Sequence, residues 1–351
     1  MSYPLSVIKM ALPVCFALRI PVAIWGPPGS GKTQMAQQLA RELEAKMYTL
    51  NLATMEPTDV GGHPYPIQRG DRTLLSWIHS DDAIPFVTPE REDELSILFA
   101  DEFDRCPQQT QNPFMNLMWE REINGRKLCP STMIVCAGNG TTDSGTTPIT
   151  EAMATRCVHL YVNSATPQAL EGWDGWAQRQ GVDPWMRAFA RYRQNLIVGK
   201  DPTYTEIQRP NQRTAYNAYL ITQFCKTVPW GREVLEPLVY GAVGQLSGRE
   251  MIAFWKMSDA APTAQEIVAN PTTTPVPLDV GVLWALGRYL IDAAGNGGAG
   301  EKTKYTEAFA TYALRWPEEA RADWMRTAST KLPSLVGTKQ FREWESHFVA
   351  A

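Results

Sequence analysis

Residues 26–33 combine glycines with a Lys-Thr pair in the spacing G-x-x-x-x-G-K-T. A glycine-rich turn lets backbone N–H groups curl around phosphate oxygens, and a helix directly behind it adds its positive N-terminal end. In such a loop Lys32 reaches the β- and γ-phosphates of a nucleotide, and the Thr33 hydroxyl is a ligand for Mg²⁺. The alternative is a Gly/Pro turn without a ligand, but the apolar run before the loop and the helical pattern after it favour a phosphate loop. The predicted nucleotide-binding residues here are Gly26, Pro27, Pro28, Gly29, Ser30, Gly31, Lys32, Thr33 and Gln34.

A second chemical motif follows the apolar run at residues 95–100, which ends in the acidic pair Asp101-Glu102. Positioning and charge stabilisation carry most of the catalysis of phosphoryl transfer. We therefore predict that Asp101 holds the Mg²⁺ shell and binds the nucleotide complex, and that Glu102 orients or deprotonates the attacking water. Many buried strands end in acidic loops, so the phosphate loop upstream is what gives this pair its significance.

A polar residue also ends the apolar run at residues 132–137, where Asn139 lies in a Gly-Asn-Gly sequence. At the tip of a strand its amide could hydrogen-bond the attacking water or the γ-phosphate. The simpler interpretation of this sequence alone is an Asn-Gly turn.

Composition and charge limit the class of protein. The chain has 351 residues, 20% of them charged and 44% hydrophobic, with a formal net charge of −4, which is ordinary for a globular protein and disfavours nucleic acid as the main partner. Its six cysteines contain no C-x-x-C pair and lie mostly in apolar segments, as in a reducing, cytoplasmic compartment. The apolar run at residues 10–18 is too short to span a bilayer, so we expect a helix there and no membrane insertion.

The pattern of elements predicts an α/β fold as far as residue 163. Five apolar runs are separated by helical patterns or long connections, which indicates a parallel five-stranded sheet flanked by helices. After residue 163 helical patterns dominate, and residues 259–279 and 295–303 are predicted to be a meandering connector and a flexible linker. The expected strands cover residues 21–25, 47–52, 95–100, 132–137 and 158–162.

In this order the motifs resemble those of the AAA+ ATPases, and among them the MoxR-like group, over about residues 5–270. Residues 101–107 are similar to the family's acidic strand end followed by Arg-x-Pro, and Asn139 matches its polar first sensor. Residues 148–156 read P-x-x-E-A-x-x-x-R, similar to the family segment whose arginine, here Arg156, reaches the nucleotide of a neighbouring subunit. Arg105 and Arg121 are lesser candidates for that role.

The resemblance also implies a P-loop AAA+ fold with three parts. These are a nucleotide-binding core at residues 1–163, an all-α lid at 164–275 and a helical C-terminal extension at 276–351. Arg213 resembles the second sensor at the start of a lid helix, with Arg209 as its rival because the spacing departs from the family's Ser-Pro-Arg.

The resemblance further implies cofactors and partners. Members hydrolyse ATP with Mg²⁺ as homo-oligomeric rings, commonly hexamers. They often act with a von Willebrand factor A-domain partner to mature a client protein. On this basis the expected function is an ATP-driven remodelling chaperone.

A hairpin pattern at residues 66–77 occupies the place of the insertion in helix 2 that marks this clade. Its polar turn lies between short apolar runs, one of which contains Leu74, Leu75 and Trp77. In a ring the hairpin would face the channel or its rim and move against a client. The alternative is a connector, with Trp77 packed on the sheet.

Four other functions fit parts of the pattern. A nucleic-acid motor or loader of the same fold would show a basic stripe. A P-loop kinase for a small molecule would work as a monomer, without an arginine from a neighbour. A GTPase is disfavoured because the Asn-Lys-x-Asp guanine signature is missing from the sequence, and a ring subunit that does not hydrolyse ATP is disfavoured by Glu102.

Overall fold

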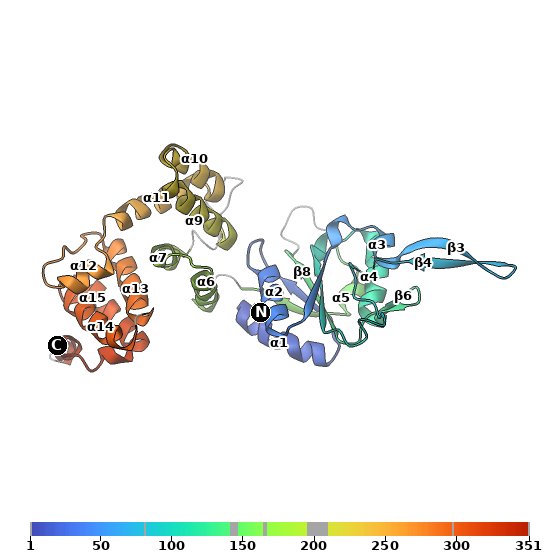
Figure 1. Ribbon diagram of the computed structural model, residues 1–351, viewed down its shortest axis with the longest axis horizontal. Helices are drawn as coiled ribbons and strands as arrows, with labels where there is room; N and C mark the ends of the chain where they lie inside the picture. The colour runs from blue at the N-terminus through green and yellow to red at the C-terminus, as the bar shows by residue number, and fades with distance from the viewer. Residues whose placement is uncertain are drawn as a thin grey trace. The chain divides into compact units, whose positions relative to one another are not determined.

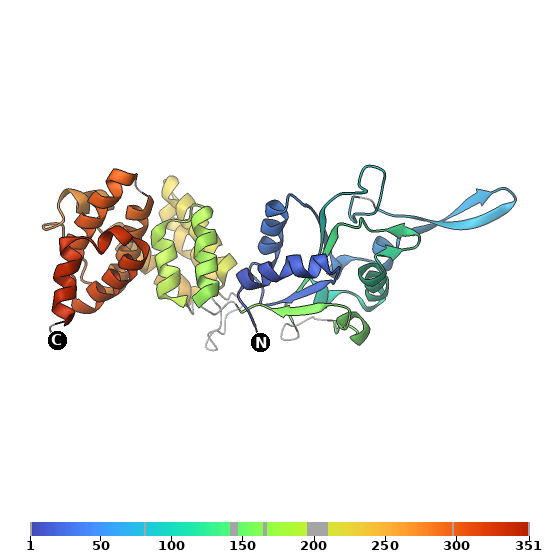
Figure 2. The same ribbon diagram turned by 90° about the horizontal axis from the view of Figure 1, so that it is seen from below.

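The chain divides into two compact units, residues 1–172 and 173–351, and each is described by itself (Figures 1 and 2). The computed structural model describes residues 2–80, 82–140, 147–163, 167–194, 210–296 and 298–349. None of the described helices is both long enough and apolar enough to cross a membrane.

The first unit is built on a parallel sheet of five strands in the order β2-β5-β8-β1-β9. The predicted α/β fold, with a parallel sheet flanked by helices and followed by a helical region, is confirmed. Because β5, β8 and β1 are parallel neighbours, the loops that follow their carboxyl ends meet at one edge of the sheet. The strands are β1 (Val22–Trp25), β2 (Lys46–Asn51), β5 (Ser96–Asp101), β8 (Thr132–Gly138) and β9 (Val158–Tyr161).

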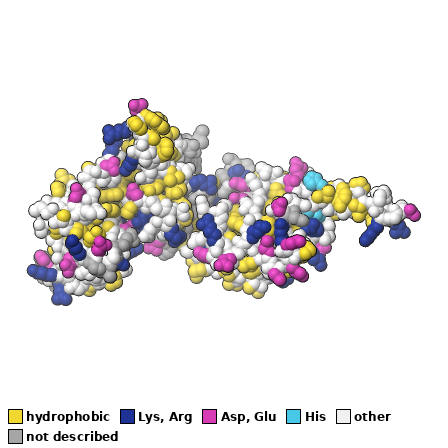
Figure 3. Space-filling model, viewed as in Figure 1, with side chains coloured by type: hydrophobic (Ala, Val, Ile, Leu, Met, Phe, Trp, Pro, Cys, Tyr) yellow, Lys and Arg dark blue, Asp and Glu magenta, His cyan; other side chains and the backbone are white. Residues whose placement is uncertain are grey.

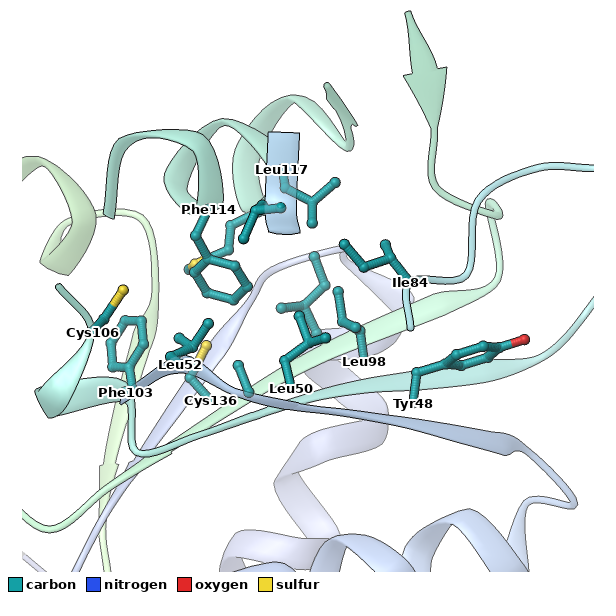
Figure 4. Close-up of a cluster of buried hydrophobic side chains, with 14 of the residues drawn as sticks. Tyr48, Leu50, Leu52, Ile84, Leu98, Phe103, Cys106, Phe114, Leu117 and Cys136 are labelled. Atoms are coloured by element: carbon teal, nitrogen blue, oxygen red, sulfur yellow. The ribbon is translucent and has the colours of Figure 1, made fainter. Parts of the chain in front are cut away.

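Two separate hydrophobic cores cover the two faces of this sheet. Side chains alternate along a strand, so Val22 and Ile24 of β1 belong to the core shared with α1 and α2. Ala23 and Trp25 belong to the core shared with α4, part of which is shown in Figure 4. The unit's helices are α1 (Leu5–Ala17), α2 (Lys32–Glu42), α3 (Pro57–Gly61), α4 (Gln108–Glu120) and α5 (Glu151–Ala154).

The predicted hairpin is present as β3 (His63–Arg69) and β4 (Arg72–Ile78), and it projects from the sheet domain (Figure 1). Its two strands are joined by the turn Gly70–Asp71, in which Gly70 has a φ of 64°. This left-handed conformation suits glycine at the first central position of a two-residue hairpin turn. A second, shorter hairpin joins β6 (Glu122–Ile123) to β7 (Arg126–Lys127).

The second unit is helical in its described residues and contains two hydrophobic cores. The three-part division at residues 163 and 275 remains a prediction. Helix α6 begins in the first unit and ends in the second. The helices of this region are α6 (Pro167–Arg179), α7 (Pro184–Tyr192), α9 (Gln212–Thr227), α10 (Gly231–Val243), α11 (Gln245–Asp259), α12 (Ala264–Ala269), α13 (Val280–Asn296), α14 (Ala299–Ala313), α15 (Glu318–Lys331) and α16 (Lys339–Val349).

Two predicted irregular segments contain helix. The connector at residues 259–279 includes α12, which begins with a reciprocal cap between Thr263 and Glu266. The predicted linker at residues 295–303 is mostly the end of α13 and the start of α14. The Glu301 carboxylate accepts the Gly298 N–H at 3.2 Å and so caps α14.

A buried ion network connects α6, α7 and α13. The Arg187 guanidinium, whose residue is 4% exposed, contacts the carboxylates of Asp174 and Asp292, and Arg191 contacts Asp174 at 2.5 Å. Burial raises the pKa of the Asp292 carboxyl. Removing one member would leave a buried charge unpaired, so these charges hold helices from both sides of the predicted boundary at residue 275 together.

The cysteines are free thiols, as the sequence suggested. Burial raises the pKa of Cys106 and of Cys157 to about 12, which keeps both thiols protonated at neutral pH. Both cysteines therefore act as small hydrophobic side chains.

Candidate nucleotide-binding site

The phosphate loop lies between β1 and α2. Gly29 and Gly31 have φ angles of 75° and 90°, a region that side chains with a Cβ rarely adopt. Gly26 is required for a different reason, because a Cβ there would lie 2.8 Å from the Val162 Cβ. The glycines therefore allow the loop to turn sharply from a buried strand into the first turn of a helix. Pro27 and Pro28 are exposed on its outer side.

Lys32 points back into this loop and is 7% exposed. Its Nζ donates to the carbonyl oxygens of Gly26 at 2.7 Å and Pro27 at 3.2 Å. It also donates to Oδ1 of Asn139 at 3.1 Å. The ammonium thus joins the phosphate loop to the end of β8.

The acidic end of β5 lies against the start of α2. The Thr33 hydroxyl donates to Oδ2 of Asp101 at 3.3 Å, which places the two predicted Mg²⁺ ligands side by side. Gln34, one residue further along α2, is exposed.

Glu102 adopts a left-handed backbone, with φ 54° and ψ 41°. This conformation is costly for a residue with a Cβ, and residues held in it cluster at functional sites. The Glu102 N–H donates to Oδ1 of Asp101 at 3.0 Å, and its carboxylate forms an ion pair with Nε of Arg105 at 3.3 Å. The turn therefore directs two successive acidic side chains to different partners.

Asp104 was not among the predicted site residues, although it positions one of them. It is 4% exposed, and its Oδ2 accepts the backbone N–H groups of Asn139 at 3.0 Å and Gly140 at 2.9 Å. The buried carboxylate thereby fixes the strand tip from which the Asn139 amide reaches Lys32. The only signal in the sequence is the position of Asp104 in the Asp-Glu-Phe-Asp run, and this run does not indicate which groups the second aspartate contacts.

Arg156 lies two residues after the end of α5. Its Nη1 donates to the Ala152 carbonyl oxygen at 2.6 Å, and its guanidinium lies 5.8 Å from the ring centre of Trp119, which is 57% exposed. Arg121 donates to the carbonyl oxygens of Cys129 and Thr132, and burial lowers its pKa. Arg121 thus has a structural role, whereas Arg156 is held at the domain surface.

Gln111 fixes the start of the segment that carries Arg156. Its side chain is fully buried in α4, and its Nε2 donates to the Pro148 carbonyl oxygen at 3.2 Å. Its Oε1 accepts the Thr150 N–H at 3.0 Å, directly before α5. The sequence offered a polar residue in an apolar helix but not its partners.

His159 of β9 connects the same segment to the phosphate-loop strand. The Trp25 indole N–H donates to Nδ1 of His159 at 2.8 Å, so the imidazole proton lies on Nε2, which donates to the Ala154 carbonyl oxygen at 2.7 Å. Trp25 is the last residue of β1, and Ala154 is the last of α5. Two hydrogen bonds therefore join the strand before the phosphate loop to the helix before Arg156.

Arg213 is the second residue of α9 and is exposed. It lies in the second unit, so it is not among the residues that the first unit brings together. Arg209 lies outside the described residues.

The residues of the loop fit a magnesium nucleotide. The Ser30 hydroxyl is buried and has no hydrogen-bond partner among the described residues, as expected of a group that meets a phosphate. The described side chains contain no cluster of three or more His, Cys, Asp or Glu that could hold a metal ion. A single carboxylate beside a hydroxyl, as at Asp101 and Thr33, suits Mg²⁺, which takes most of its ligands from phosphates and water.

This combination of fold and site defines a P-loop nucleotide-binding domain. Residues 22–160 match the family model described as "ATPase family associated with various cellular activities (AAA)". That stretch therefore carries the AAA family's domain, and it covers less than half of the chain.

Comparison with other proteins adds little to this assignment. No curated protein matches the sequence. NtrX from Brucella abortus is 17% identical, with 94% of this chain and 68% of that chain covered and a TM-score of 0.36. A RuvB mutant from Thermotoga maritima is 13% identical, with 84% and 88% covered and a TM-score of 0.41. At such scores neither structure supports an inference about activity or partners.

Proposed function

We propose that this protein hydrolyses ATP and uses the energy to remodel a client protein. The observation that carries the proposal is the direct contact of four predicted groups, since Lys32 meets Asn139 and Thr33 meets Asp101 at one edge of the sheet. These groups come from three different segments, and a turn without a ligand would not need to bring them together.

Each residue has a separate role in this mechanism. When bound, Mg²⁺-ATP supplies the γ-phosphoryl group that water attacks. Lys32 neutralises charge on the β- and γ-oxygens, and Thr33 and Asp101 hold the cation. Glu102 takes the proton of the water on its carboxylate, which pairs with Arg105 in this structure. Asn139 orients the water or the γ-phosphate.

We further propose that the protein works as a ring of six identical subunits, in the manner of MoxR-like ATPases. Arg156 supports this proposal because its guanidinium lies at the surface beside the exposed Trp119, where a neighbouring subunit could receive it. A von Willebrand factor A-domain protein is the proposed partner, by resemblance alone. The hairpin β3–β4 is the proposed client-contacting element, since it projects with exposed apolar side chains.

A Glu102→Gln variant tests the hydrolytic proposal. Glutamine has nearly the same shape but cannot take a proton, so we expect ATP binding to persist while turnover falls by about 100-fold or more, within the range of general-base catalysis. Glu120→Gln, an exposed change on α4, is the matched control and should hydrolyse at the wild-type rate.

The same variant tests the chaperone proposal. Held in its ATP state, it should form a larger assembly than the nucleotide-free protein in light scattering and should retain a client that ADP releases. Wild-type turnover by Glu102→Gln contradicts the assignment of the base. A fully active monomer contradicts the ring.

Asp104 provides an independent test of the site. Asp104→Ala removes the acceptor of two buried N–H groups, and hydrogen bonds to charged groups contribute about 1.5–3 kcal/mol each. We expect kcat to fall about ten-fold or more while ATP affinity changes little, because Asn139 is displaced but the loop is not. Asp104→Asn keeps an acceptor oxygen and should retain most activity. The exposed Asp93→Ala is the control, and a folded Asp104→Ala protein with wild-type kcat would refute the positioning role.

A further inference from the structure

The backbone of the hairpin β3–β4 has two edges with different hydrogen-bonding capacity. Arg69 and Arg72 flank the two-residue turn and pair directly, so their N–H and C=O groups bond each other. In an antiparallel ladder such pairs alternate with pairs whose backbone groups point outward. The register therefore turns outward the backbone groups of Pro64, Pro66 and Gln68 on β3 and of Thr73, Leu75 and Trp77 on β4.

The edge of β3 is largely closed to another strand. Pro64 and Pro66 have no N–H, and both occupy outward positions, where the hairpin itself needs no donor. Only Gln68 can donate from this edge.

The edge of β4 is open. Thr73, Leu75 and Trp77 each present an N–H and a C=O, and among the described residues β3 and β4 form a sheet of two strands with no third. Leu75 is 63% exposed, Leu74 39% and Ile78 57%. Because side chains alternate along a strand, Leu75 borders this edge on one face of the hairpin, and Leu74 and Ile78 border it on the other. Hydrophobic side chains gather on the hairpin in the view of Figure 3. An unpaired edge with apolar borders is what an added strand requires.

The charges at the tip of the hairpin favour a ligand with a negatively charged group. Arg69 and Arg72 lie directly opposite each other, and like charges in this position destabilise a strand pair. With Asp71 in the turn, the tip still carries an excess positive charge, visible in Figure 3. A carboxylate beside the two arginines would relieve their repulsion.

We propose that the open edge of β4 binds an extended segment of the client as an added strand. The segment carries apolar residues at alternate positions, which pack on Leu74, Leu75 and Ile78, and an acidic residue at the end next to Arg69 and Arg72. This inference rests on the proposed function only in so far as it calls the bound protein a client. The binding itself needs no nucleotide.

The test uses two fluorescein-labelled peptides with the full-length protein, in the absence of ATP. Each contains three valines alternating with threonines and two aspartates, at the N-terminus in one peptide and at the C-terminus in the other. The two peptides cover antiparallel and parallel addition. We expect fluorescence anisotropy to detect binding of at least one of them, and replacing its aspartates with lysines should weaken that binding.

A matched pair of variants distinguishes the two edges. Thr73 and Gln68 face each other, and their side chains share one hydrogen bond of 2.8 Å. Thr73→Pro and Gln68→Pro both lose that bond, and each removes one outward N–H, but from opposite edges. We expect Thr73→Pro to weaken peptide binding ten-fold or more and Gln68→Pro to change it less than two-fold.

Methylating the alternate amide nitrogens of the peptide tests the same hydrogen bonds without altering the protein. We expect this change to abolish binding. The proposal is overturned if neither peptide binds, if both proline variants have the same effect, or if methylation has none. It is also overturned if Thr73→Pro instead abolishes self-association of the chain, or if duplex DNA displaces the peptide and is itself the tighter ligand.

Basal ATPase activity separates this inference from the proposed function. Both proline variants should hydrolyse ATP at the wild-type rate, since the hairpin projects from the sheet domain on the side away from α2, at whose start Lys32 lies (Figure 1). A wild-type protein that binds the peptide but does not hydrolyse ATP refutes the proposed function and leaves the β4 edge supported.

Discussion

Replacing Lys32 with methionine should lower the affinity for ATP by about 100-fold or more. The change keeps the length of the side chain but removes the ammonium that faces the loop carbonyl oxygens and Asn139. Charge-assisted hydrogen bonds contribute about 1.5–3 kcal/mol each, and about 1.4 kcal/mol corresponds to a factor of ten. Isothermal titration calorimetry with ATP and Mg²⁺ measures the effect.

Two controls separate loss of charge from loss of structure. Lys46→Met removes an ammonium from an exposed side chain on β2 and should leave ATP affinity unchanged. Lys32→Arg keeps the charge but replaces a compact ammonium with a planar group that the buried loop cannot accommodate in the same way. Unchanged affinity in a folded Lys32→Met protein would show that the loop does not hold the phosphates.

The second large effect is expected at Arg156. Arginine fingers contribute about 10³ to 10⁵ in rate, so Arg156→Ala should lower kcat by about 10³ while ATP binding persists. Steady-state kinetics and calorimetry measure the two quantities on the same preparation. The exposed Arg41→Ala on α2 is the matched control and should retain activity.

A mixing experiment tests whether Arg156 acts between subunits. Arg156→Ala subunits keep an intact phosphate loop, and Lys32→Met subunits keep an intact arginine. When the two inactive proteins assemble together, some interfaces join an intact loop to an intact arginine, and part of the activity should return. If no mixture recovers activity although mixed assemblies form, Arg156 does not act in trans.

Residues at the ends of apolar runs could be predicted from the sequence. Lys32, Asp101 and Asn139 each follow a run of buried residues, and in a parallel sheet such ends meet at one edge. Their contact in the structure follows from that geometry. The local sequence pattern is sufficient to predict these residues, because the adjacent residues in the chain indicate both the strand and the loop that follows it.

Residues whose role depends on a distant partner could not be predicted in this way. Asp104 acts through the backbone of Asn139, and His159 acts through Trp25 and Ala154. Nothing in the residues next to Asp104 or His159 indicates these partners, because folding alone brings them together. Arg213 is a different case, since its proposed role depends on how the two units meet.

One missed element did have a local signal. The sequence Thr-Ala-Gln-Glu at residues 263–266 is a capping box, and α12 begins there. The surrounding prolines and threonines suggested an irregular connector. The helix within it begins where the side chains of Thr263 and Glu266 each accept a hydrogen bond from the other residue's backbone N–H.

The two prolines of β3 also limit how far a strand pairing can spread. A hairpin with two open edges is bivalent, because every strand that pairs presents a fresh edge to the next chain, and such growth leads to fibres. With Pro64 and Pro66 on one side, the hairpin is monovalent. Two copies that met through β4 would form a closed pair of hairpins with a proline-bearing strand at each outer edge, and polymerisation would stop at that pair. The chain can thus expose an unpaired strand edge without forming polymers through that edge.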